Sequence, residues 1–505
     1  MGSGNNSSDH SWLKFRRNTD IRDNAEHLSN DFAARIGYVF AFWLADRLQT
    51  TPDRLILAVG RDSRPSGQRL SDALIRGMTA ADCDVFDCGL CTTPAMFMTT
   101  VMPETRANGA VMVTAGASAA EKNGFKFILP DGLILDADVE ELIRRAENAA
   151  VPDRLVQKMD FLPRYAAHLK QQAKIWLDDD ALKPLLGLYV IVDAGNGTGG
   201  FFADLLEELG ADVTGSLNLL PDGNFPGHSP STENDALNAI AQAVRENEAD
   251  LGVLLDPDCT RAVIVNEKGQ PLSGNRMIAL ISAILLEKHP GATIVTDSVT
   301  SSGLTQFITE WGGVHYRYRR GYRNVINEAV RLNDEDIDCP LAIETSGYAA
   351  FRENYFLDDG IYLATRLICE ALNLKREGKT LSSLIEELQE PVERAEIRMN
   401  VLADDFRDTC QEIFDMILSH TLDNPDWTLA PDSREGVRIN FNLDGGINNA
   451  WFQVRLSVHD PVIPLNAESD VPLGLRRMLT QLYNLLKHAE GIDLEPLRKV
   501  VENAD

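Results

Sequence analysis

The chain has 505 residues and a formal net charge of −28, from 48 Lys and Arg against 76 Asp and Glu. That balance argues against a nucleic acid or an anionic membrane surface as a partner, because both require a concentrated cationic face. Hydrophobic residues form 44% of the sequence, which excludes disorder of the whole chain, and the longest apolar runs fall well short of the roughly 18 residues that span a bilayer.

The N-terminus and the cysteines bear on the cellular compartment. The first residues, MGSGNNSSDHS, contain no apolar signal-peptide core and predict a flexible lead-in. The seven cysteines are odd in number, and the C-G-L-C spacing has no second pair that would complete a zinc site. We therefore expect small core residues with reduced thiols, in a cytoplasmic protein.

Three stretches of the chain share one layout: an apolar strand, a Gly- or Ser-rich turn, an amphipathic helix and a second strand. They begin LILAVGRDSRPSG, LYVIVDAGNGTGG and ATIVTDSVTSSG. In the second and third copies the second strand is expected at Val213 and Val314. The apolar positions have the spacing of helices packed on a sheet: Leu70, Ala73, Leu74 and Met78; Phe202, Leu205, Leu206 and Leu209; Leu304, Phe307, Ile308 and Trp311. Such repeats predict three similar α/β domains.

Another apolar strand recurs later in each copy, in GAVMVTAGAS, ADLGVLLDPD and CPLAIETSG, and each runs into a small or acidic loop. Ligands of open α/β sheets bind beyond the C-terminal ends of the strands. Each loop taken alone is consistent with an ordinary strand-end turn. Their repetition favours the hypothesis that the three loops face one shared cleft.

The region after about residue 392 has a different pattern. The strand-like runs EIRMNVL, GVRINFNL and AWFQVRLSV alternate with amphipathic helices expected at 406–417 and 473–486, after a linker at Pro391. The predicted fold class is therefore α/β, with three similar α/β domains that contain mixed sheets, followed by a C-terminal α+β domain. The predicted domains are 1–170, 171–275, 276–392 and 393–505.

Three early motifs point to a family when they are taken in order. They are N-T-D-I-R, which ends at Arg22, G-R-D-S-R, which contains Arg61, and the strand-end C-T-T-P. Together with the later loops they resemble the α-D-phosphohexomutase superfamily, which includes phosphoglucomutase, phosphomannomutase and phosphoglucosamine mutase. The resemblance covers nearly the whole chain and implies a heart-shaped arrangement of four domains around a central cleft. It also implies phosphoryl transfer between a phosphoserine and C1 or C6 of a hexose phosphate, through a bisphosphate and with the help of a divalent cation.

The nucleophile loop of that family reads T-A-S-H-N-P or T-A-S-H-L-P and is followed by N-G-x-K. This chain has T-A-G-A-S-A and then N-G-F-K at the same spacing, so that Gly116 stands at the serine position and Ala117 at the histidine position. Glycine has no oxygen to phosphorylate. Ser118 is the substitute nucleophile, two positions along, although a displacement of about 1 Å can cost about 100-fold in rate. The resemblance implies Lys126 as general acid/base and Arg22 as a further catalytic group.

The metal loop of the family reads D-x-D-x-D-R, and here it is D-P-D-C-T-R. Asp256 and Asp258 keep the first two carboxylates, whereas Thr260 replaces the third. Alternating carboxylates on an extended loop share a hard cation. With the third carboxylate and the phosphoserine both missing, we expect Mg²⁺ to bind weakly or only together with substrate phosphate. Arg261 is retained and is expected close to a phosphate.

The sugar loop G-E-x-S-G-H of the family corresponds to I-E-T-S-G-Y, in which Glu344 and Ser346 are implied to bind a pair of sugar hydroxyls and Tyr348 replaces the histidine. Upstream, R-R-G-Y-R-N places Arg320 in the family's phosphate-proximal turn. Downstream, D-D-G at Asp358 matches a helix-opening motif that we interpret as an N-cap.

The phosphate loop R-x-S-G-T-E-P of the family is replaced by R-L-S-V-H-D-P. Arg455 and Ser457 are implied to bind the phosphate that is not transferred, and Arg61 is implied to bind substrate. His459 is either a further donor or an ordinary loop residue. The scarce bases of this acidic chain thus gather where phosphate is expected: Arg22, Arg61, Arg64, Lys126, Arg261, Arg319, Arg320, Arg323 and Arg455.

Two hypotheses follow. In the first, the chain is a divergent phosphohexomutase that uses Ser118 or a hexose bisphosphate donor. In the second, which the loss of the serine favours, it is a catalytically silent paralogue that binds a hexose phosphate or regulates a partner protein. An engineered nucleophile variant would have the same sequence. In either case the expected ligand is a small phosphosugar, and neither nucleic acid nor membrane is an expected partner.

Overall fold

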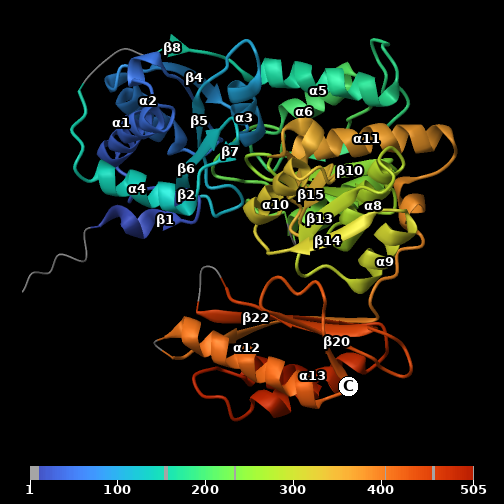
Figure 1. Ribbon diagram of the computed structural model, residues 1–505. Coiled ribbons are helices and arrows are strands. Elements are labelled where there is room, and N and C mark those ends of the chain that lie inside the picture. The colour runs from blue at the N-terminus through green and yellow to red at the C-terminus, as the bar shows by residue number, and fades with distance from the viewer. Residues whose placement is uncertain (1–10, 153–156, 233–234, 404, 458–460, 504–505) are drawn as a thin grey trace, which may run out of the picture. The chain divides into compact units, whose positions relative to one another are not determined.

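The computed structural model describes all residues except 1–10, 153–156, 233–234, 404, 458–460 and 504–505, so the predicted lead-in at the N-terminus lies almost wholly outside the described residues (Figure 1). The chain divides into two compact units. Unit 1 comprises Met1–Leu272, Gly347–Ala349 and Asn354–Leu381, and unit 2 comprises Ser273–Ser346, Ala350–Glu353 and Ser382–Asp505. No helix in the described part of the chain is long and apolar enough to cross a membrane.

The first sheet of unit 1 is mixed and has the strand order β1-β2-β6-β5-β3-β4-β8, with β7 paired to β6. The pairs β3–β4, β3–β5 and β4–β8 are parallel, whereas β5–β6 and β2–β6 are antiparallel. Its strands are β1 (Arg16–Arg17), β2 (Asp20–Asn24), β3 (Ile56–Arg61), β4 (Asp84–Leu90), β5 (Gly109–Val113), β6 (Lys122–Leu129), β7 (Gly132–Leu133) and β8 (Gln157–Lys158).

Helices cover both faces of this sheet. One core cluster joins alternate strand residues such as Leu57, Val59 and Val111 to α1, α2 and α4. The intervening residues, such as Ala58, point to the other face because side chains alternate along a strand, and α3 contacts β3 and β5 there. The helices are η1 (Trp12–Phe15), α1 (Asn30–Arg47), η2 (Pro52–Arg54), α2 (Gly67–Ala80), α3 (Thr93–Val101), α4 (Asp136–Ala146) and α5 (Leu162–Leu177).

The second sheet of unit 1 has the order β12-β11-β10-β9, in which β9 and β10 are parallel and the other pairs are antiparallel. The strand expected at Val213 is absent: this prediction was wrong. The segment after α6 makes only isolated parallel bridges at Asp212 and Leu217, because the Asp212 carboxylate accepts the backbone N–H of Thr214 and turns the chain. The elements are β9 (Val190–Asp193), α6 (Phe201–Glu208), α7 (Asp235–Asn247), β10 (Leu251–Leu255), β11 (Ala262–Asn266), β12 (Pro271–Leu272) and α11 (Gly360–Arg376).

The third sheet has the order β14-β13-β15-β16-β17, and β13 pairs in parallel with β14 and β15, as the repeat predicts. The chain passes between the two units around β16 and β17. The elements are α8 (Asn275–Leu286), β13 (Thr293–Asp297), α9 (Ser302–Glu310), β14 (Val314–Tyr318), α10 (Tyr322–Asp334), β15 (Leu341–Ile343), β16 (Ala349–Phe351), η3 (Arg352–Asn354), β17 (Leu357–Asp358) and η4 (Leu381–Ile385).

The C-terminal sheet in unit 2 is wholly antiparallel, with the order β18-β22-β21-β20-β19. The core residues from its strands pack with those of α12 and α13 in one cluster, which agrees with the α+β prediction. The elements are β18 (Glu393–Asn400), α12 (Phe406–Asp423), β19 (Trp427–Leu429), β20 (Val437–Phe441), β21 (Ala450–Val454), β22 (Val462–Ser469), α13 (Gly474–Leu486) and α14 (Glu495–Asn503).

Candidate functional site

The loop that corresponds to the nucleophile loop connects β5 to β6, and a buried arginine holds it in place. The Arg64 side chain is fully buried, and its Nε lies 3.0 Å from Asp62 Oδ2. Its two Nη atoms donate to four backbone carbonyls of the loop, at 2.6–2.9 Å: those of Gly116, Ser118, Ala119 and Lys122. A guanidinium has five N–H donors, and here each has one acceptor. The expectation that Arg64 faces a phosphate was therefore wrong: it is a structural residue.

Gly116 lies at the centre of this loop. Its φ of +55° is in the left-handed region, which disfavours residues with a Cβ. A Cβ built on it would meet only Asp258 Oδ1, at 3.8 Å. The loop therefore leaves open space beside Asp258, and Gly116 supplies no hydroxyl to fill it.

The nucleophile-type and metal-type loops meet through a buried ion pair. Lys126 on β6 places its Nζ 2.7 Å from Asp258 Oδ2, and Thr93 Oγ1 donates to the same oxygen at 2.7 Å. Burial opposes ionisation of Asp258, but the Lys126 ammonium and the Thr93 hydroxyl outweigh it and lower the pKa of Asp258 to about 2. Asp258 is therefore a carboxylate at neutral pH, and Lys126 is its counter-ion.

The second carboxylate of the metal-type loop is also enclosed by protein donors. Asp256 Oδ1 accepts the backbone N–H of Arg261 at 2.9 Å, and Asp256 Oδ2 lies 3.2 Å from Arg261 Nε. The Thr260 hydroxyl lies between the two aspartates, 3.2 Å from Asp256 Oδ2 and 3.3 Å from Asp258 Oδ1. Burial, followed by the neighbouring charge of Asp258, raises the pKa of Asp256.

The residues of this loop do not fit a resident Mg²⁺. Mg²⁺ requires several oxygen ligands at about 2.0–2.1 Å in near-octahedral geometry. All four oxygens of Asp256 and Asp258 already accept hydrogen bonds from the protein, and the third ligand position is a neutral hydroxyl. Within the described part of the chain, no group of three or more His, Cys, Asp or Glu side chains is arranged to hold a metal ion.

Arg22, Ser118 and Tyr348 lie around the same loops of unit 1. Arg22 Nη1 donates to Ser118 Oγ at 3.1 Å, and its Nη2 donates to Asp20 at 2.8 Å. Its Nε is buried and has no hydrogen-bond partner among the described residues. The Arg261 guanidinium lies over the Tyr348 ring, 5.3 Å from the centroid. After Thr114, the segment T-A-G-A-S-A has one hydroxyl, that of Ser118. Arg22 contacts this hydroxyl and still has one donor, Nε, without an acceptor among the described residues.

The D-D-G motif is structural, as predicted. Asp359 is the N-cap of α11, and its side chain accepts the backbone N–H of Tyr362. The N–H of Gly360 donates to the carbonyl of Cys259 at 3.0 Å. A Cβ on Gly360 would come within 2.5 Å of the Arg261 backbone, so the glycine is required for this close approach. The helix start therefore fixes the metal-type loop.

In unit 2 the sugar-type loop is held by a network of acidic and basic groups. Glu344 accepts the backbone N–H of Gly321 at 2.6 Å and the Ser346 hydroxyl at 3.0 Å. Asp297, at the end of β13, accepts both the N–H and the hydroxyl of Thr345, and Arg320 Nε lies 3.8 Å from it. Burial, then the charge of Asp297, raises the pKa of Glu344 to about 7. Sequence patterns did not single out Asp297, although it ends a repeat strand.

The phosphate-type loop follows β21. Arg455 is 8% exposed, and its Nε is buried without a hydrogen-bond partner in the described structure. Burial, opposed by Glu435, lowers the pKa of Arg455. The backbone N–H of Ser457 donates to the carbonyl of Val462. His459 lies outside the described residues. Arg455 is thus a buried cation with an unused donor, which suits an anionic ligand.

Two further features lie outside these loops. Arg61 is partly exposed at the end of β3, where its Nε donates to Gln68 at 3.1 Å, so its guanidinium is accessible to a ligand.

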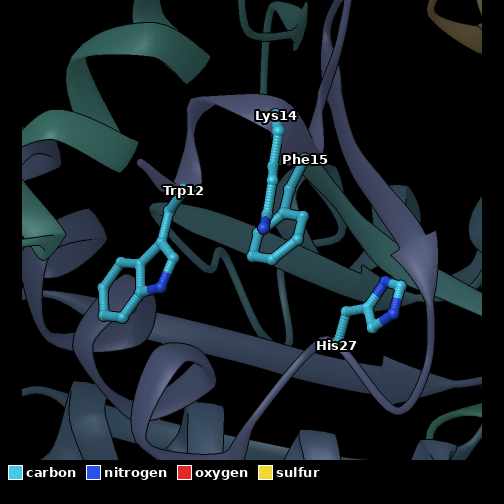
Figure 2. A pocket seen from close by; sticks show the side chains of 4 residues that line it. All are labelled: Trp12, Lys14, Phe15 and His27. Carbon is cyan, nitrogen blue, oxygen red and sulfur yellow. The ribbon is translucent and has the colours of Figure 1, made fainter. Parts of the chain in front are cut away.

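A hollow of about 450 Å³ is lined by Trp12, Lys14, Phe15 and His27 (Figure 2). None of those four is a predicted site residue, so the hollow is separate from the residues that carry the chemistry.

The fold and the loops together define a protein of the α-D-phosphohexomutase type. Family models for domains I, II and III of phosphoglucomutase/phosphomannomutase, each described as alpha/beta/alpha, match residues 14–151, 163–269 and 273–392. These matches cover well over half of the chain. The chain belongs to the phosphoglucomutase/phosphomannomutase family.

Relatives of similar length include a phosphomannomutase/phosphoglucomutase of Pseudomonas syringae pv. tomato, 30% identical over 87% of this chain and 88% of the relative. A phosphoglucomutase/phosphomannomutase of Thermococcus kodakarensis is 29% identical over 92% of this chain and 96% of the relative. Among solved structures, a family protein from Burkholderia thailandensis superposes with a TM-score of 0.78 at 25% identity, over 95% of this chain and 98% of that one.

A more distant structural neighbour is the N-acetylphosphoglucosamine mutase of Aspergillus fumigatus, in a serine-to-alanine variant solved with glucose 1,6-bisphosphate. It has a TM-score of 0.55 and 13% identity, over 94% of this chain and 95% of that one. At that identity the likeness concerns the fold alone.

Proposed function

We propose that this chain binds hexose phosphates and does not transfer the phosphoryl group through a phosphoserine at residue 116. The observation that carries the proposal is the arrangement of residues beside Asp258. Gly116 offers no hydroxyl there, and the Lys126 ammonium lies against the carboxylate that the family resemblance assigns to the metal. Both the covalent carrier and the cation on which the family reaction depends are affected.

Groups suited to holding a phosphosugar support the binding half of the proposal. Glu344 and Ser346 present polar groups suited to sugar hydroxyls, and the basic turn at Arg320 lies beside Asp297. Within the described part of the chain, the buried Nε of Arg455 has no hydrogen-bond acceptor, so it can donate to a phosphate. We propose hexose 1-phosphates, hexose 6-phosphates and hexose bisphosphates as the ligand class.

One observation favours the second candidate, a divergent mutase that uses Ser118. Arg22 donates to Ser118 Oγ at 3.1 Å, so a cation is already in place to neutralise a phosphoryl group on that oxygen. The backbone carbonyl of Ser118 is held by Arg64, which fixes the residue at its displaced position. A phosphoryl group that appears on Ser118, and is lost in Ser118→Ala, would establish this candidate instead.

Calorimetry with glucose 1-phosphate, mannose 1-phosphate and glucose 1,6-bisphosphate tests the binding. Arg455→Gln removes a charge-assisted contact worth about 1.5–3 kcal/mol, which corresponds to a loss of about ten- to a hundredfold in affinity. The matched control is Arg477→Gln, because Arg477 pairs with Asp444 on an exposed surface of the same unit and should leave affinity unchanged. Absence of any phosphosugar binding by the wild-type chain would refute the proposal.

A cytoplasmic location fits this proposal. All seven cysteines are free thiols and all are buried, as expected for a protein of a reducing compartment. Burial raises the pKa of Cys88, Cys91 and Cys259, so these thiols are unreactive.

A further inference from the structure

The carboxylates of the metal-type loop are held mainly by protein donors, and the Asp258 oxygen that faces Gly116 has the Thr260 hydroxyl at 3.3 Å. Asp256 and Asp258 are 1% and 0% exposed. Asp258 Oδ2 accepts hydrogen bonds from Lys126 Nζ and Thr93 Oγ1, both at 2.7 Å. Asp256 accepts hydrogen bonds from the backbone N–H and the Nε of Arg261. A cation that approached either carboxylate would have to break contacts that these buried groups cannot replace with water.

The charges of this cluster balance. Two carboxylates face two fixed cations, Lys126 and Arg261, and the Thr260 hydroxyl between them is neutral. Lys126 is itself almost buried, with a side chain 7% exposed. An ammonium donates along N–H directions at about 2.7–2.9 Å, and it neutralises one charge without the octahedral shell of a divalent ion.

We propose that the Lys126 ammonium takes the place of a divalent cation in this family member, so that the cluster of Asp256, Asp258, Lys126 and Arg261 is electrically complete without metal. The inference rests on the same contacts beside Asp258 as the proposed function, but it does not require a bound sugar. Phosphosugar affinity is therefore independent of Mg²⁺. Loss of the ammonium leaves the cluster net negative, and two carboxylates then attract a divalent ion.

The test uses Mn²⁺ alone as a spectroscopically visible stand-in for Mg²⁺, added to the full chain without sugar phosphate. The EPR signal of free Mn²⁺ should be unchanged by the wild-type protein. Lys126→Met should bind one Mn²⁺ at least about tenfold more tightly than wild type, because even at an effective dielectric constant of about 20 a unit charge a few Å from a dication is worth more than that factor. Lys122→Met is the matched control, since Lys122 begins the same strand and no hydrogen bond or ion pair of the described residues joins its side chain to either aspartate.

A second variant decides the matter if Lys126→Met fails to fold. Thr260→Asp places a third carboxylate between Asp256 and Asp258, makes the cluster net negative and should also gain Mn²⁺ binding. Tight binding of one Mn²⁺ to the wild-type chain would overturn the inference. So would a folded Lys126→Met that stays metal-free, or, if that variant does not fold, a folded Thr260→Asp that stays metal-free. Calorimetric phosphosugar binding is measured separately, so its failure would count against the proposed function and leave this inference standing.

Discussion

Arg64→Met should strongly destabilise unit 1. The substitution removes all five donors from a fully buried side chain, leaves the Asp62 carboxyl without its counter-charge and removes a guanidinium donor from each of four loop carbonyls. Burial already raises the pKa of Asp62, which shows how costly its charge is at this position. Removal of one partner of a buried ion pair costs about 3–5 kcal/mol. The family domain that contains this loop, matched over residues 14–151, is close in length to domains of about 150 residues, which lose about 2–4 °C in melting temperature per kcal/mol; this gives a fall of about 6–20 °C.

Differential scanning calorimetry of the full chain measures the melting, and hydrogen exchange of the amides between β5 and β6 measures the loop directly. Arg61→Met is the control, because Arg61 is partly exposed and, among the described residues, donates only to Gln68 and, at 3.4 Å, to the Asp62 carbonyl. Its effect should stay within about 1 kcal/mol. If Arg64→Met melts with the wild type and its loop exchanges no faster, the structural role assigned to this arginine is wrong.

Three further outcomes are expected. Gly116→Ser should fold but lose roughly 1–2 kcal/mol in stability, because residue 116 has a φ of +55°. It should gain no mutase turnover in a coupled assay, because Lys126 remains ion-paired with Asp258; efficient turnover would contradict this prediction. The hydrogen bond to Asp193 raises the pKa of His228, so this contact stabilises the folded state below about pH 6.5 and loses its effect as the pH rises through the folded-state pKa. His228→Asn should therefore lower the melting temperature more at about pH 5.5 than at about pH 8.5, and an equal loss at both values would count against the prediction. Burial raises the pKa of Glu344 to about 7, so the contribution of Glu344 to the free energy of unfolding falls as the pH rises from about 4.5 to about 7. Glu344→Gln should make the melting temperature less dependent on pH in this range, and an unchanged dependence would show that Glu344 does not titrate there.

The sequence predicted the fold well where the local signals agree with one another. The first strand of each repeat pairs in parallel with the later apolar strand of the same copy: β3 with β5, β9 with β10 and β13 with β15. The N-cap at Asp359 follows from the D-D-G motif alone, because capping depends on residues next to each other in the chain. The strand expected at Val213 failed because the side chain of Asp212 competes with the sheet for the backbone.

The site was harder to predict because its chemistry depends on partners that are distant in the sequence. Arg64 has the residue type and the motif of a phosphate-binding group, and only the structure reveals that Asp62 and four loop carbonyls use all five donors. Lys126 stays a predicted general acid/base, and its ion pair with Asp258, 132 positions along the chain, could not be inferred from the N-G-F-K motif. The small Thr93 hydroxyl on the same carboxylate gave no signal of its own within the C-T-T-P motif.

The most direct test is to incubate the purified chain with glucose 1,6-bisphosphate, to follow binding by calorimetry and to record the intact mass of the same sample. The account predicts saturable binding, an unchanged mass and no interconversion of glucose 1-phosphate and glucose 6-phosphate when the bisphosphate is present. A phosphatase-sensitive gain of one phosphoryl group, together with turnover above that of Lys126→Ala, would contradict it.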